Sequence, residues 1–458
     1  MDAACIGTNR RDFLRGAAFL GAAAALPRAA SAVGERPLLK VAIMSDVQGY
    51  PYPEDAGMRN LERALDVLSA FRPDVVVGAG DINDTGRNAD AVAYYKARCD
   101  ARLGVVPHVA CMGNHEIGFV PKELKATRTP AACLRDFNAM FGYGPDEWVV
   151  RRTIAGYDFI SLSLSRIEGY TGEEIARLKA AIDESVRRDA TKPVFVVTHY
   201  HAKNTVNDSS SASASEPLRR LLDGYPQVVS LSGHTHNPLQ DPRSIWQGSF
   251  TAVDTSTLCY GCITMNPPSV NQVSCLIPYG HESVGFMLLE IYGDRLVFRR
   301  FTARDRRELD PGDPWTVPWP CDPSKAPYAF ERRRAAERAP QFAGDAEPTL
   351  WYDFGYIYLM FNAAAHPESV LGYRVEIAPA GAEAASYFQL GDYYRIPEHR
   401  QNRIVFKAPP GSLVPGACHR CRIYPVGFFG AEGRPAEWRF TTKPYYRPRT
   451  DKLACVQE

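Results

Sequence analysis

Residues 75–84 read Val-Val-Val-Gly-Ala-Gly-Asp-Ile-Asn-Asp and join a short apolar run to a polar loop that contains glycine. Such a run, ended by turn-forming residues, is typical of a buried β-strand. A helical pattern follows at 90–103, and a second strand-like run at 105–112 leads into Gly-Asn-His-Glu at 113–116. This alternation of strand, polar loop and helix predicts an α/β domain. In such domains ligands collect at the carboxyl ends of the strands.

The same unit recurs over the first 300 residues. Further strands are expected at 38–44, 194–197, 228–231, 248–251 and 255–257. Further helices are expected at 60–71 and 173–188, a strand or hairpin at 154–164, and a hairpin at 284–301 that turns at Gly293-Asp294. The repeated unit therefore extends the α/β prediction to most of the N-terminal two thirds.

Polar clusters follow five of these strands. They are Asp46-Val47-Gln48, Gly80-Asp81-Ile82-Asn83-Asp84, Gly113-Asn114-His115-Glu116, Thr198-His199-Tyr200-His201 and Gly233-His234-Thr235-His236. Five of the ten histidines of the chain lie in the last three clusters. Imidazole, carboxylate and amide groups are ligands that divalent Zn, Mn, Fe and Mg ions accept. Each cluster alone is a weak signal, but the series predicts a metal site.

Two further features of the clusters favour a shared site. In His234-x-His236, alternate side chains of an extended backbone point to the same side, so both are expected to reach one centre. The glycines before Asp81, Asn114 and His234 allow the close backbone approach that a crowded site requires.

In order and spacing, the five clusters resemble the calcineurin-like metallophosphoesterase superfamily. The signature of that family runs Asp-x-His, Gly-Asp-x-x-Asp/Asn, Gly-Asn-His-Asp/Glu, a single His, and Gly-His-x-His. The resemblance covers roughly residues 38–300 and departs at one position, where Gln48 replaces the first histidine. It implies an α/β (α+β) fold: a metallophosphoesterase β-sandwich flanked by helices.

The resemblance also implies a site with two divalent metal ions (Mn, Fe, Zn or Mg). One ion would be held by Asp46, Gln48, Asp81 and His236, and the other by Asp81, Asn114, His199 and His234, with Asp81 bridging. A hydroxide that bridges the two ions would attack the phosphorus of a phosphate ester.

Three further roles follow for residues beside the ligands. His115 would protonate the leaving oxygen, and Asp84 or Glu116 would orient its imidazole. Asn114 and His115 would contact the substrate. His201 would contact the phosphate or be a plain loop residue.

Gln48 changes what the first metal position is expected to bind. An amide oxygen is a harder and weaker donor than imidazole, so this position would favour Mn, Mg or Fe over Zn, or bind its ion loosely.

The first 32 residues are expected to be an export signal. Arg10 and Arg11 precede an alanine-rich apolar run from Gly16 to Leu26 that is too short to span a bilayer. Ala30-Ser31-Ala32 has the small-x-small pattern of a signal-peptidase site. The pattern resembles a twin-arginine signal peptide, which implies the twin-arginine export machinery as a partner and a periplasmic or extracellular location. No transmembrane span is expected in the mature chain.

The charge balance and the cysteines bear on which kinds of binding site the chain is expected to have. Among 458 residues, 53 basic and 52 acidic side chains leave no signature of nucleic-acid binding. Eleven cysteines in an exported chain make disulfides plausible without fixing their pairing. The pairs Cys259/Cys262 and Cys418/Cys421 are widely separated, which favours structural cysteines over a second metal site.

The composition changes after the metallophosphoesterase-like region, which is assigned to 33–309. Residues 310–348 are interpreted as a linker rich in proline and arginine that packs back on it, and 349–445 as a smaller all-β sandwich that resembles a fibronectin type III domain. The strands of this sandwich are expected at 357–361, 372–377, 403–406, 421–425 and 438–442. Its aromatic residues Tyr387, Phe388, Tyr393 and Tyr394 are expected in its core, with stacking on a base or sugar as the alternative.

The sequence therefore predicts an exported, metal-dependent phosphoesterase acting on small or macromolecular phosphoester substrates. Two alternatives stay open: a phosphodiesterase or nucleotidase instead of a monoesterase, and a non-catalytic surface-binding protein that retains metal.

Overall fold

The structure is a computed structural model that describes residues 35–84, 89–118, 128–207, 209, 214–265, 273–276, 280–353 and 356–444. The expected export signal at 1–32 lies outside this part of the chain. Within the described residues, no helix combines the length and apolar character needed to cross a membrane.

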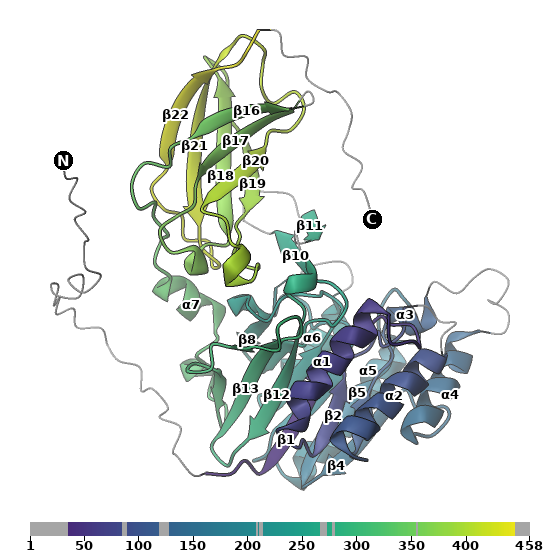
Figure 1. The fold of residues 1–458 in the computed structure, drawn as a ribbon. Helices are drawn as coiled ribbons and strands as arrows, with labels where there is room; N and C mark the ends of the chain where they lie inside the picture. The colour runs from purple at the N-terminus through teal and green to yellow at the C-terminus, as the bar shows by residue number, and fades with distance from the viewer. Residues whose placement is uncertain are drawn as a thin grey trace, which may run out of the picture. The chain divides into compact units, whose positions relative to one another are not determined.

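Two large β-sheets form the body of the N-terminal region (Figure 1), which also carries the two-stranded sheet of β10 Cys262–Met265 and β11 Val273–Leu276. The first has the order β14-β13-β12-β1-β2-β3, and β15 also pairs with β13. Its strands are β1 Leu39–Met44, β2 Val75–Gly78, β3 His108–Ala110, β12 Gly285–Ile291, β13 Arg295–Thr302, β14 Glu308–Leu309 and β15 Trp315–Pro318. The second has the order β4-β5-β6-β7-β9-β8. Its strands are β4 Val149–Ile154, β5 Tyr157–Leu162, β6 Val194–Thr198, β7 Val228–Ser232, β8 Ile245–Gln247 and β9 Thr251–Asp254.

The two sheets pack face to face, and helices cover their outer faces (Figure 1). Val41 and Ile43 of β1 share one buried cluster with Phe159 of β5 and Phe195 of β6. Residues with the opposite orientation, such as Met44, pack instead with the helices. Strands covered on both sides read as continuous apolar runs, as β2 and the last four residues of β1 do. The predicted β-sandwich flanked by helices is confirmed.

Local signals start and stop the helices. Asp55 caps α1 Ala56–Ser69 by accepting from Met58 N at 3.0 Å. Thr171 and Glu174 form a capping box at α5 Gly172–Arg188. The other helices of four or more residues in the described chain are α2 Ala89–Leu103, α3 Asn114–Ile117, α4 Pro130–Phe141, α6 Glu216–Leu222 and α7 Phe330–Ala336. Sequence reasoning missed α4 and α6.

Parallel pairing brings the polar clusters to one edge of the sandwich. β1, β2 and β3 are parallel, with Met44 opposite Gly78 and Gly78 opposite Ala110. β5, β6, β7 and β9 are parallel too, and Thr198 lies opposite Ser232. The carboxyl ends of these strands therefore carry all five clusters.

The strand that follows β8 was predicted at the wrong residues. Strands were expected at 248–251 and 255–257, but the strand is β9 at 251–254. The threonines that follow stabilise the loop: Thr255 Oγ1 donates to Ser232 O at 3.1 Å, and Thr257 Oγ1 donates to Asp46 O at 3.0 Å. Their β-branched shape suggested a strand, whereas their hydroxyl groups fix a turn beside the site.

The C-terminal region is all-β. β16 Thr349–Asp353, β17 Tyr356–Asn362 and β20 Arg403–Lys407 form one sheet, in the order β16-β17-β20. The other sheet has the order β19-β18-β21-β22, with strands β18 Gly372–Pro379, β19 Ala385–Leu390, β21 Cys418–Val426 and β22 Ala436–Thr441. A shared buried cluster lies between the sheets. The predicted all-β sandwich is present; β16 and β19 were not anticipated, and its fibronectin identity stays a prediction.

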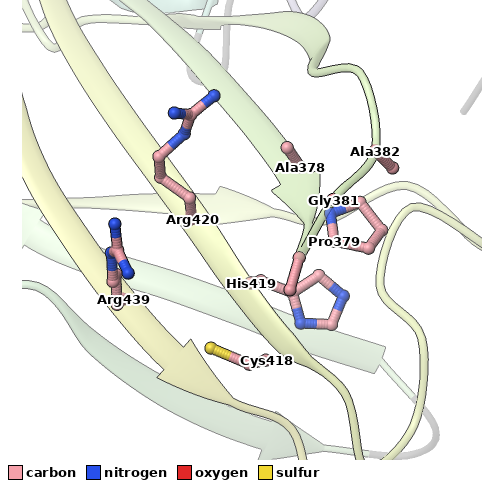
Figure 2. Close-up of a pocket in the computed structure, with 9 residues that line it drawn as sticks. Ala378, Pro379, Gly381, Ala382, Cys418, His419, Arg420 and Arg439 are labelled. Carbon is pink, nitrogen blue, oxygen red and sulfur yellow. The ribbon is translucent and has the colours of Figure 1, made fainter.

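The cysteines of β21 do not form a metal pair. Cys418 is exposed and Cys421 is buried, because a spacing of three residues places side chains on opposite faces of a strand. Cys418, Arg420 and Arg439 are among the residues that line a hollow of about 290 Å³ at the end of this sheet. Figure 2 shows their side chains. The described residues Cys99, Cys111, Cys133, Cys259, Cys321, Cys418 and Cys421 are free thiols.

Candidate metal centre

Asp81 lies at the centre of the predicted site. Its Oδ2 is 3.1 Å from His199 Nε2 and 3.5 Å from Gln48 Nε2, and its Oδ1 accepts from His115 N at 2.8 Å. Burial alone would raise the pKa of Asp81, but His199 and His115 hold it well below the usual range. The carboxylate is therefore ionised and contacts members of both predicted ligand sets.

One half of the site is formed by Asn114, His199 and His234. Asn114 Oδ1 is 3.0 Å from His199 Nε2. His199 Nδ1 lies 2.9 Å from the carbonyl of Ala79, which leaves Nε2 facing Asp81. Ligand atoms of Asp81, His199 and His234 all lie within 4.8 Å of one another. This group has the size and donor types of a metal-binding cluster.

The other half is formed by Asp46, Gln48 and His236. His236 Nε2 is 3.1 Å from Asp46 Oδ1 and 3.3 Å from Gln48 Nε2. His236 Nδ1 lies 2.9 Å from Tyr260 O, so the other ring nitrogen faces the site. An amide presents either its nitrogen or its oxygen after a flip, so Gln48 offers an oxygen ligand from the same position.

The donor set fits divalent metal ions. Burial lowers the pKa of His234 well below its ordinary value, which keeps that ring neutral. Against the effect of burial, Asp81 raises the pKa of His199 to about 9 and Asp46 raises the pKa of His236, so a bound cation would displace the protons of these two rings. Among the described residues, the His234 ring makes aromatic contacts with Tyr200 and His199 and no hydrogen bond. A half-buried imidazole that lies beside Asp81 and His199, with no hydrogen bond to the described residues, is an open ligand position.

Backbone strain is concentrated at the predicted ligands. Five of them have left-handed backbone conformations: Asp46 (φ 48°), Gln48 (φ 44°), Asp81 (φ 50°), His234 (φ 76°) and His236 (φ 54°). Each such residue costs about 1–3 kcal/mol and persists only where the surroundings fix it. The expectation that His234 and His236 alternate on an extended backbone was therefore wrong. Both reach the site through left-handed turns.

The glycines of the clusters allow the close approach that the sequence predicted. A Cβ atom on Gly80 would lie 2.5 Å from His199 Nδ1, and one on Gly113 would lie 2.2 Å from Asp81 Oδ1. A Cβ atom on Gly233 would lie 2.4 Å from Asp46 Oδ2. Any side chain at these positions would displace a ligand.

His115 lies beside the ligands, and its side chain is 18 % exposed, against at most 1 % for Asp81 and His199. Its Nδ1 is 2.7 Å from the carbonyl oxygen of Asp84, and its Nε2 is 3.8 Å from Asp81 Oδ2. Tyr50 OH in turn donates to the Asp84 carboxylate at 2.8 Å. Of the two residues expected to orient His115, Asp84 contacts the ring.

Glu116 has a different role from the predicted one. Its carboxylate accepts from four backbone N–H groups, those of Asp81, Ile82, Asn83 and Gly113, at 2.6–3.1 Å. Burial and the charge of Asp81 raise the pKa of Glu116 to about 7. The carboxylate therefore fixes two ligand loops to each other instead of orienting the His115 ring.

His201 is 2 % exposed and turns away from the ligands. Its Nδ1 lies 2.6 Å from Ser232 Oγ, and its Nε2 lies 3.0 Å from Thr235 Oγ1 and 3.3 Å from Asp254 Oδ2. Since both ring nitrogens are engaged inside the protein, His201 is a supporting loop residue. The alternative of a phosphate contact was wrong.

Sequence reasoning missed several residues that support the site. Asp254 ends β9 and would have been found by the strand-end rule had that strand been assigned correctly. Tyr170 OH accepts from His199 N and Tyr200 N, both at 3.1 Å. Nothing in the sequence near Tyr170 indicates this contact, because it joins segments about thirty residues apart.

Comparison with known families agrees with this geometry. Residues 39–238 match the family model described as calcineurin-like phosphoesterase. A search of curated proteins finds no significant match. Residues 39–238 are therefore a calcineurin-like metallophosphoesterase domain.

The solved structures that match this chain include a phosphatase and a nucleotidase precursor. A purple acid phosphatase from yellow lupin (Lupinus luteus) seeds is 14 % identical, with a TM-score of 0.46, over 61 % of this chain and 53 % of that one. A 5'-nucleotidase precursor from Thermus thermophilus is 15 % identical, with a TM-score of 0.30, over 65 % of this chain and 57 % of that one. A two-domain fibronectin type III segment of chicken tenascin is 16 % identical, with a TM-score of 0.17, over 39 % of this chain and 82 % of that one. The chain thus matches about half the length of the two enzymes.

Proposed function

We propose that this protein is an exported hydrolase of phosphate esters that works with two divalent metal ions. The observation that carries the proposal is the position of Asp81, which contacts Gln48 on one side and His199 on the other. When bound, two ions would polarise the phosphoryl oxygens and lower the pKa of a water molecule. Asp46, Gln48 and His236 would hold one ion, and Asn114, His199 and His234 the other.

His115 would supply the proton for the leaving oxygen. Because Nδ1 faces the Asp84 carbonyl, which only accepts, that nitrogen carries a hydrogen and Nε2 is the atom that gains and loses the proton. The partial exposure of this side chain supports a role at the substrate, whereas the buried ligands face one another.

The test is hydrolysis of aryl phosphate monoesters and diesters with added Mn, Zn or Mg. We expect turnover that His115→Gln lowers about 10²- to 10⁴-fold for poor leaving groups and less for nitrophenol, which leaves without protonation. His366→Gln, at an exposed histidine of the C-terminal region, is the matched control. Turnover no greater than that of the double variant Asn114→Ala, His115→Ala with every metal would refute the enzymatic proposal and favour a metal-retaining binding protein. Preference between the two ester classes separates a monoesterase from a phosphodiesterase or nucleotidase.

Two further measurements test the finer parts of the proposal. Metal analysis should find two ions per chain, and fewer would mean that the Gln48 position stays unfilled. Export through the twin-arginine pathway rests on Arg10 and Arg11. Arg10→Lys with Arg11→Lys should leave the precursor in the cytoplasm, and unchanged export would contradict this route.

A further inference from the structure

The loop that carries the last two ligands is fixed by the residue between them. Thr235 Oγ1 donates to the Asp254 carboxylate, accepts from Asn237 Nδ2 at 3.0 Å, and lies 3.0 Å from His201 Nε2. The flanking residues His234 and His236 both have left-handed backbone conformations. Through these hydrogen bonds, the Thr235 side chain holds the strained loop against the protein interior.

A chain of buried amides continues outward from Thr235. Asn237 Nδ2 donates to Asn207 O at 3.0 Å, and Asn207 Nδ2 donates to Asn237 Oδ1 at 3.1 Å. The same Asn207 nitrogen is 3.5 Å from Asp241 Oδ2. Asn237 and Asp241 are fully buried, so solvent does not compete for these hydrogen bonds.

The carboxylate of Asp241 accepts a hydrogen bond from a residue of the C-terminal all-β region. Tyr394 OH donates to Asp241 Oδ2 at 2.8 Å, and Arg243 Nη2 donates to the same oxygen at 2.7 Å. Tyr394 is 1 % exposed. Its neighbour Tyr393 donates to the carbonyl of Gln240 at 2.8 Å. Two adjacent tyrosines therefore hold the segment that directly follows the last metal ligand.

A second series of hydrogen bonds joins the C-terminal region to the backbone of His236. His399 Nδ1 is 2.7 Å from Glu282 Oε1, and Glu282 belongs to the short 3₁₀ turn Gly280–Glu282. Gly261 N donates to Gly280 O at 2.9 Å, and the next residue, Cys262, donates its N–H to His236 O at 3.0 Å. The C-terminal region thus contacts both segments that hold His236.

We propose that Tyr394 is a positioning residue of the metal centre, which makes the C-terminal all-β region a working part of the site. Through Asp241 and the two asparagines, its hydroxyl group limits the movement of the loop that presents His234 and His236. This inference rests on the metal site of the proposed function, but it does not depend on which ester is hydrolysed.

The first test compares Tyr394→Phe with Tyr373→Phe in the full chain. Tyr373 is equally buried, and its hydroxyl accepts from Ala364 N at 2.8 Å entirely within the C-terminal region. We expect Tyr394→Phe to weaken Mn²⁺ binding, measured by calorimetry, about three- to tenfold, below the 10–100-fold typical of groups that bond a ligand directly. Tyr373→Phe should lower thermal stability and leave Mn²⁺ affinity unchanged. Equal Mn²⁺ affinities in wild type and both variants would overturn the proposal.

The second test needs no variant and stays valid if Tyr394→Phe fails to fold. Because coupling between two sites is reciprocal, Mn²⁺ binding to the wild-type protein should slow amide hydrogen exchange at 393–400 as well as at 233–241. Protection confined to the ligand loops would refute the coupling. Since exchange is measured without substrate, a protein that shows the coupling and hydrolyses no ester would disprove the proposed function alone.

Discussion

Gly113→Ala is the sharpest test of how the site is built. Gly113 has φ −100°, a conformation that alanine adopts without backbone strain, so the substitution isolates the effect of one methyl group. That methyl carbon would lie 2.2 Å from Asp81 Oδ1 and 2.8 Å from His199 Cδ2. Real Cβ atoms stay at least 3.0 Å from such neighbours, so Asp81 or the loop must move by about 0.8 Å. The carboxylate shared by both predicted ligand sets is therefore the group displaced.

The size of the effect follows from this displacement. A misplacement of about 1 Å costs about 10²-fold in rate, and overpacking of a tight interior costs about 1–3 kcal/mol of stability. We expect Gly113→Ala to lower turnover of an aryl phosphate about 30- to 100-fold at saturating Mn²⁺ and to weaken Mn²⁺ binding measured by calorimetry. Gly172→Ala is the control, because that helical glycine has no atom within 4 Å of an added Cβ. A Gly113→Ala protein with wild-type turnover, metal affinity and urea midpoint would show that the loops are not packed as described.

Three other perturbations have definite expected outcomes. Glu116→Ala leaves four buried backbone N–H groups without their acceptor, so urea unfolding should show a loss of about 3–5 kcal/mol, and a loss below about 1 kcal/mol would contradict this role. Burial, aided by Lys96, lowers the pKa of His108 to about 4. The unfolded chain binds this proton near pH 6.5, so about 3 kcal/mol of stability should be lost as pH falls from 6.5 to 4. Unfolding in chelator at several pH values should show that His108→Leu removes this loss, whereas His366→Leu should not. Removal of metal by chelator should lower the melting temperature of the wild-type protein, and Mn²⁺ at about 100 times its Kd should restore about 2.7 kcal/mol; an unchanged melting temperature would argue against a bound metal.

The ligand-bearing strands could be predicted because their signals are local. β1 and β2 are mostly apolar runs followed by polar residues, and each lies within one residue of its expected bounds. The helix α4 was missed although its signals are present: Thr129 caps it, Pro130 begins it and Gly142 ends it in a left-handed conformation. The sequence therefore contains the signals needed to predict α4. β19 is different, because it has one buried residue in six and no clear alternation.

The orientation of side chains after a strand ends could not be predicted. His199 and His201 are two residues apart, yet His199 faces Asp81 while His201 faces Ser232. Alternation holds only along a strand, and β6 ends at Thr198. Likewise, the sequence around Glu116 indicates a polar loop but not that its carboxylate binds four backbone groups. Such contacts depend on segments far apart in the chain, so a local pattern does not encode them.

The left-handed ligands explain why so many buried polar groups surround the site. At about 1–3 kcal/mol each, five strained residues together cost an amount comparable to the net stability of a whole protein. That strain persists because the relaxed loop conformations would break the hydrogen bonds of Glu116 on one side and of Thr235 on the other. The two anchors act on different ligand loops, so their effects on metal affinity should add when both are weakened. The metal centre is therefore a property of its supporting network as much as of its ligands, and a variant that keeps every ligand but loses an anchor should bind metal poorly.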